Sequence, residues 1–89
     1  MSGNLKEIGA VPGSLVRLVG YGSSLYSRYD PDTDRYFGAP RHLVELKYVA
    51  LVIARVTPGT FLILCRDELI FVRIWGQYDL DSRWEPVGA

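Results

Sequence analysis

Apolar and polar residues alternate along several short stretches of the chain, with the period of two residues that a β-strand shows. The first stretch is 14–20, in which Leu15, Arg17 and Val19 fall on one side of a strand. Residues 43–47 are compatible with one helical turn and 75–82 with a bend or one 3₁₀ turn, but no long helix is predicted, so the sequence predicts an all-β fold. Turn residues separate the first stretch from further strand patterns at 48–56, 61–65, 69–74 and 83–87.

The turn residues also predict how the strands are connected. Residues 57–60 (Thr-Pro-Gly-Thr) and 66–68 (Arg-Asp-Glu) are short enough to join the three central strands into an antiparallel meander over 48–74. Residues 75–82 contain glycine and aspartates and predict a bend. Pro86 predicts that the last strand lies at a sheet edge, because proline cannot donate a ladder hydrogen bond.

A long loop rich in tyrosine, glycine and serine covers 21–42. Within it, Pro31 suits the first central position of a turn, Asp30 can accept backbone N–H groups, and Asp34 tolerates a left-handed backbone. We therefore expect a small hairpin in which 26–29 pairs with 35–37 and whose flanks carry aromatic side chains.

The central strands are apolar on both sides, although a strand with one wet face alternates apolar and polar residues. A barrel interior covers one side only, and we expect it to take Ala50, Val52 and their neighbours. The expected second face carries a further set of large apolar residues: Val49, Leu51, Ile53, Phe61, Ile63, Leu69 and Phe71.

Leaving that second face in water would cost about 1.5–3 kcal/mol per side chain, or roughly 10–20 kcal/mol in all. This exceeds the net stability of about 5–10 kcal/mol expected for so small a domain. The face must therefore be covered, either by residues 1–13 and 21–42 of the same chain or by another chain. The sequence leaves both alternatives open.

Size and charge narrow the range of functions. The 89 residues suffice for one domain, which we divide into an N-terminal arm at 1–13 and a β domain at 14–89. Ten basic residues balance ten acidic ones, which argues against a nucleic-acid partner. Cys65 is the only cysteine, so an internal disulfide is excluded. The sequence shows neither a signal peptide nor a membrane span. We expect a reducing compartment, because a free thiol without disulfides is typical of one.

No residue set supports catalysis. His42 is the only histidine, and no nucleophile motif accompanies it. Asp30, Asp32 and Asp34 imitate the start of a calcium loop, but Arg35 stands where that loop needs glycine. We therefore expect no enzymatic activity, no metal, no cofactor and no small-molecule substrate.

The order of the elements resembles that of SH3-like small β-barrels, on the basis of PGSLVR at 12–17, the meander at 48–74 and the bend at 75–82. The resemblance covers about 12–87 and implies a five-stranded barrel with a long aromatic loop after the first strand. The acidic and aromatic pairs of a proline-recognition groove are not at their expected places. The segments PGSLVRL and FVRIWGQYDLDSRWEPV also resemble small barrel proteins encoded by bacteriophages.

These observations favour a structural or assembly protein that joins or decorates a larger homo- or hetero-complex, such as a phage capsid or connector, in the virion or the cytoplasm. The alternative is an SH3-like or Tudor-like module that binds a peptide or a nucleic acid. Protein partners, among them a second copy of the chain, are the partners we expect. The expected interface combines the loop aromatics, the second face and two residues of the bend: Tyr21, Tyr26, Tyr29, Tyr36, Phe37, Val49, Leu51, Ile53, Phe61, Ile63, Leu69, Phe71, Trp75 and Tyr78.

Overall fold

The structure is a computed structural model of the chain, and it describes residues 3–19, 24–40, 49–74 and 83–88. Within these ranges every helix or strand is a β-strand, which confirms the all-β prediction. The predicted helical turn at 43–47 and the predicted bend at 75–82 lie outside the described residues. The strands are β1 (Leu15–Leu18), β2 (Leu25–Tyr26), β3 (Arg28–Asp30), β4 (Arg35–Phe37), β5 (Val49–Thr57), β6 (Thr60–Cys65), β7 (Glu68–Arg73) and β8 (Trp84–Pro86).

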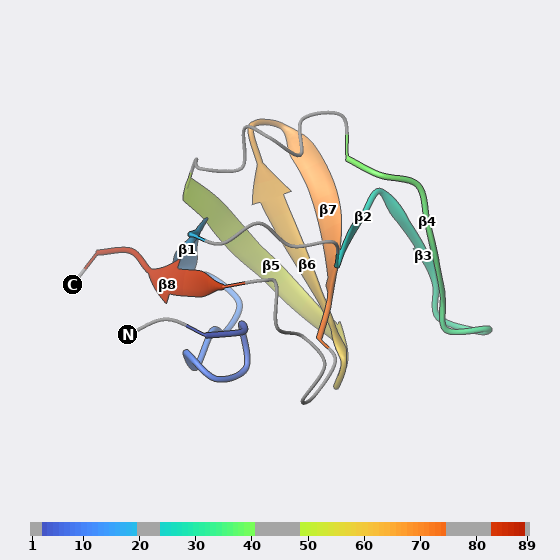
Figure 1. The fold of residues 1–89 in the computed structure, drawn as a ribbon, viewed down its shortest axis with the longest axis horizontal. Helices are drawn as coiled ribbons and strands as arrows, with labels where there is room; N and C mark the ends of the chain where they lie inside the picture. Colours follow the sequence, from blue (N-terminus) through green and yellow to red (C-terminus); the bar gives the residue numbers. More distant parts are fainter. Residues whose placement is uncertain (1–2, 20–23, 41–48, 75–82, 89) are drawn as a thin grey trace.

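Six of these strands form one antiparallel sheet in the order β2-β7-β6-β5-β1-β8, and β3 pairs with β4 as a separate hairpin. The sheet is strongly curled, with β8 and β2 at its opposite ends (Figure 1). Since these end strands do not pair with each other, the sheet is an open half-barrel. The expected closed, five-stranded barrel is therefore wrong.

The additional strand explains the difference. β2 has only two residues, and it extends the sheet by pairing with Phe71 and Val72 of β7. A strand this short shows no alternation, so its presence depends on the edge that β7 offers. At the other end, Gly3 forms a bridge with Trp84, and the arm covers the edge that a closed barrel would have paired.

The predicted meander is confirmed as β5, β6 and β7. A two-residue turn joins β6 to β7, and both Arg66 and Asp67 have positive φ, 50° and 65°. This geometry belongs to the hairpin turns whose twist matches that of the flanking strands. Pro86 lies in β8 at the end of the sheet, as predicted for a residue that lacks an N–H group.

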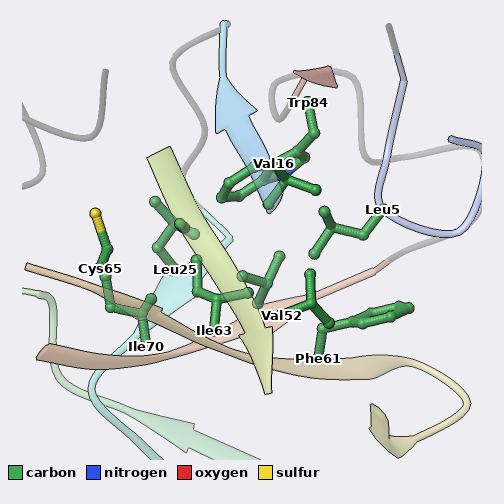
Figure 2. Close-up of a cluster of buried hydrophobic side chains, with 11 residues drawn as sticks. Leu5, Val16, Leu25, Val52, Phe61, Ile63, Cys65, Ile70 and Trp84 are labelled. Carbon is green, nitrogen blue, oxygen red and sulfur yellow. The ribbon is translucent and has the colours of Figure 1, made fainter. Parts of the chain in front are cut away.

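The concave side of the sheet holds the core. Val52, Phe61, Ile63 and Ile70 are at most 1% exposed, and Figure 2 shows them facing Leu5 and Trp84 from neighbouring strands. Leu5 is 0% exposed, so the N-terminal arm supplies a full core side chain. The described part of the arm, residues 3–13, thus contributes to the core on the concave side.

Two predicted members of the second face, Phe61 and Ile63, belong to the core, and placing them outside was wrong. Phe61 pairs with Val72, and Ile63 pairs with Val52 and Ile70, all of which face inward. Alternation alone does not say which side of a strand faces the core, and a register change of one residue exchanges the two sides. The outward residues of β6 are Leu62 and Leu64.

β5 also departs from simple alternation. The register of its pairing with β6 shifts between Val52 and Ala54 and again between Arg55 and Thr57. Each shift inserts one unpaired residue, as a β-bulge does. Arg55 consequently pairs with Phe61 and places its guanidinium 5.3 Å from that ring, instead of sharing a side with Val49 as alternation predicted.

The hairpin predicted within the loop is present, with its first strand shifted to Arg28–Asp30. Asp30 accepts a hydrogen bond from the backbone N–H of Asp32 at 3.0 Å, and Asp34 has a φ of 53°, as their residue types predicted. Tyr26, expected in the hairpin, lies in β2. The hairpin projects next to β2, at that end of the sheet (Figure 1).

Candidate protein-protein interface

A line of leucines crosses the convex outer face of the sheet. Leu15 of β1 pairs with Leu51 of β5, Leu51 pairs with Leu64 of β6, and Leu64 pairs with Leu69 of β7. Directly paired residues of antiparallel strands point to the same side, so these side chains form one continuous leucine row. With about 4.8 Å between strands, the row is roughly 14 Å long.

The leucine row is open to solvent. Leu15 is 46% and Leu69 is 50% exposed, while Leu51 and Leu64 between them are half-buried. Beside the row lie Val49 and Ile53, which are 38% and 37% exposed. Scattered exposed leucines are normal on a protein surface, whereas these leucines form one contiguous apolar group across four neighbouring strands.

The hairpin covers the neighbouring part of the outer face with aromatic rings. The ring of Tyr36 lies 4.9 Å from that of Tyr26 and 4.5 Å from that of Tyr29, and Tyr29 lies 5.8 Å from Phe71. Such tilted contacts are favourable beyond the area they bury. Of the two predicted covers, the loop therefore shields one end of the face and leaves the leucine row exposed.

Tyr36 anchors the hairpin to the sheet. Its hydroxyl shares a hydrogen bond with the hydroxyl of Thr60, a side chain with 0% exposure. The guanidinium of Arg73 lies 5.0 Å from the centre of the Tyr36 ring. Burial raises the pKa of Tyr36, because the surrounding side chains disfavour the phenolate.

Charged residues stand at one border of the face. Arg17 of β1 follows the leucine row along its strand and pairs with Glu85 of β8. Their side chains form an ion pair of 3.4 Å and are 44% and 39% exposed. An ion pair this exposed adds little to the stability of the fold.

The predicted interface residues separate into distinct groups. Tyr26, Tyr29, Tyr36 and Phe71 form the aromatic cluster under the hairpin, and Phe37 is 43% exposed on β4. The predictions for Tyr21, Trp75 and Tyr78 lie outside the described residues. The remaining outward members of the predicted set lie in the leucine row or beside it: Val49, Leu51, Ile53 and Leu69.

The sequence-based set omitted Leu15 and Leu64, which complete the leucine row. A signal for Leu64 was present, because a two-residue turn at Arg66 and Asp67 places Cys65 opposite Glu68 and therefore Leu64 opposite Leu69. Leu15 had no comparable signal. Its pairing with Leu51 joins strands that are distant in the sequence.

Among the described residues, the potential metal ligands do not gather in one place and the cysteine Cys65 is buried. The described residues contain no cluster of three or more His, Cys, Asp or Glu side chains that could hold a metal ion. Cys65 is 4% exposed, and burial raises the pKa of its thiol, which disfavours the nucleophilic thiolate. No helix in the described ranges is long and apolar enough to cross a membrane.

Comparison with protein-family models, with curated proteins and with solved structures found no match for this chain.

Proposed function

We propose that this chain is a non-enzymatic structural protein that joins a larger protein complex through the outer face of its half-barrel. The observation that carries the proposal is the leucine row, whose end residues Leu15 and Leu69 are about half exposed. Burying apolar side chains is the main driving force of protein association. A partner covering this face would therefore gain most of its binding energy there.

The remaining features of the chain support the same proposal. The aromatic hairpin beside the face is rich in tyrosine, which offers a large contact area at low entropic cost. We extend the proposal to an SH3-like domain and to a component of a phage particle, and only the sequence resemblance supports these two extensions. The phage extension concerns which complex the chain joins, whereas the leucine row concerns the surface through which it joins.

An experiment on the natural complex tests the proposal. Tagged chain, sedimented in a native extract of its natural source, is expected to migrate well above its own mass of 10.0 kDa. The variant with Leu15→Glu and Leu69→Glu is expected to migrate as a free chain, because two buried charges oppose the contact. If both proteins sediment at 10.0 kDa, the proposal is wrong.

A second candidate function is a peptide-binding module. A hollow of about 340 Å³ on the hairpin is lined by Arg28, Tyr29, Asp30 and Phe37, which combine a cation, a carboxylate and aromatic rings. These groups suit a short peptide with a charged and an aromatic side chain. Titration with a peptide library, followed by the NMR signals of Tyr29 and Phe37, tests it, and unchanged signals would remove it.

A further inference from the structure

We infer that the hollow on the hairpin binds a short acidic segment of a partner protein, in which a carboxylate side chain lies two residues from an aromatic or aliphatic one. The inference rests on the second candidate function and names the class of peptide. It follows from which charged groups around the hollow already have partners within the chain.

The two faces of the hairpin differ in what they contact. Tyr29 and Tyr36 belong to the aromatic cluster and face the sheet. Successive residues of a strand point to opposite faces, so Arg28 and Asp30 lie on the outward face. Phe37 pairs directly with Arg28 and therefore lies on the same outward face. The hollow thus opens on a face that the aromatic cluster does not use.

The carboxylate that lines the hollow is already engaged in the turn. One oxygen of Asp30 accepts the backbone N–H of Asp32 at 3.0 Å, and the other accepts the hydroxyl of Thr33 at 2.9 Å. On the opposite face, Asp34 accepts the hydroxyl of Tyr29 at 2.8 Å. These two carboxylates therefore stabilise the hairpin itself.

The cation of the hollow has no such partner. Arg28 is exposed, and its side chain forms no ion pair or hydrogen bond with another residue of the described ranges. Phe37 opposite it is 43% exposed. A guanidinium binds a carboxylate through two parallel hydrogen bonds, and an exposed ring gains free energy when an apolar side chain covers it. Together they suit one acidic and one apolar side chain.

The distance between Arg28 and Phe37 sets the spacing of the two ligand side chains. The Cα atoms of directly paired residues lie about 4.5–5.5 Å apart. Side chains on one side of an extended peptide are separated by two residues, or about 6.8 Å. The long side chain of Arg28 spans the difference, so an extended segment across the two strands places its acid at Arg28 and its apolar side chain on Phe37.

A peptide suits this hollow better than a nucleic acid does. Binding of a polyphosphate chain depends on several cations that act together. Here the carboxylate of Asp30 lines the same hollow as Arg28, and the whole chain has no excess of basic residues. A single carboxylate, by contrast, needs a single guanidinium.

NMR titration of the purified chain with three short peptides tests the inference. The first carries glutamate and phenylalanine separated by one serine, and the others carry glutamine or lysine in place of the glutamate. Two side-chain contacts predict a dissociation constant of about 0.1–1 mM for the glutamate peptide. The glutamine peptide is expected to bind at least about fivefold more weakly, because it loses the charge-assisted hydrogen bonds, and the lysine peptide more weakly still.

Variants of Arg28 identify the group responsible. Arg28→Gln should make the glutamate and glutamine peptides bind alike, and Arg28→Glu should reverse the preference in favour of the lysine peptide. Arg17→Gln is the matched control, because Arg17 is also an exposed arginine but lies on β1, three strands away from β2. It should change each affinity by less than about twofold, since charges so distant are screened. Circular dichroism checks that each variant is folded.

The outcomes separate this inference from the proposals on which it depends. Equal binding of the three peptides to the wild type, or equal losses for Arg28→Gln and Arg17→Gln, would overturn the inference and leave the second candidate function standing. Tighter binding of a short single-stranded oligonucleotide than of the glutamate peptide would overturn it as well. If no peptide shifts the signals of Tyr29 and Phe37, the second candidate function falls with it. Sedimentation in the native extract tests the outer face independently.

Discussion

At the residue scale, the contact between Tyr36 and Thr60 decides how the hairpin is held. The two hydroxyls share a hydrogen bond, and Thr60 has no exposed surface. Removing the Tyr36 hydroxyl leaves that of Thr60 buried without its partner, which costs about 1–3 kcal/mol. The hairpin therefore depends on one polar contact as well as on its aromatic packing.

This contact predicts a loss of stability at alkaline pH. The pKa of Tyr36 is raised in the folded state, chiefly by burial, so the folded chain favours the neutral phenol. Its contribution is complete below the unfolded pKa of 10.0 and is lost as the pH rises through the folded value. Urea unfolding of the wild type and of Tyr36→Phe, from about pH 8 to about pH 11, measures it. The stability difference between the two proteins should shrink with rising pH, and a constant difference would contradict the prediction.

A second residue-scale prediction concerns Leu5. Its side chain is 0% exposed in the core, although it belongs to the arm. Leu5→Ala is expected to destabilise the fold by about 2–5 kcal/mol, because it removes buried methyl groups and leaves a cavity. Val11→Ala in the same arm, at a side chain 58% exposed, serves as control and should change stability by less than about 0.5 kcal/mol. Chemical denaturation measures both, and similar values would show that the arm is dispensable.

At the element scale, Gly38 allows the end of the hairpin to lie close to Ser27, the residue just before β3. Its φ is 71°, and a Cβ added there would collide with the hydroxyl of Ser27. The backbone N–H of Ser27 donates to the carbonyl oxygen of Gly38 at 3.4 Å, so the two residues lie side by side. Glycine is required here for both its left-handed backbone and its missing side chain.

We predict that Gly38→Ala costs about 2–3 kcal/mol, from left-handed strain of about 1–2 kcal/mol and a steric contribution. Gly9→Ala separates the two, because Gly9 has the same φ of 71° but nothing within 4 Å of an added Cβ. Thermal unfolding should therefore show a smaller loss for Gly9→Ala. Combining Gly38→Ala with Ser27→Gly should recover the difference, and no recovery would mean that the Ser27 contact is unimportant.

At the scale of the whole molecule, the half-barrel has a core on its concave side and an apolar outer face that the hairpin covers only in part. A partner that binds only the folded chain stabilises it by mass action. We predict that the melting temperature of the wild-type chain is higher in its native complex than in the free state, and that the variant with Leu15→Glu and Leu69→Glu shows no such rise. Differential scanning calorimetry of the isolated complex and of the free chain measures this, and equal melting temperatures for the wild type in both states would contradict the prediction.

Local patterns in the sequence were sufficient for the elements. The β-branched and apolar runs predicted β5, β6 and β7, the Pro31 and Asp34 turn predicted the hairpin, and Pro86 predicted an edge strand, since each depends on residues close together in the chain. The apolar character of both sides of the meander was also visible before any pairing was known.

Only the tertiary structure decided which side of each strand faces the core and which faces outward. Phe61 and Ile63 face the core, and Leu64 faces outward, because pairing with β5 and β7 sets the register. The leucine row joins Leu15 to Leu51 across a long separation in the sequence, and β2 exists only because β7 offers an edge. The sequence by itself determined that the central strands carry apolar side chains on both sides, since composition and alternation count such side chains. Which of them face the core depended on long-range pairing, which no local pattern encodes.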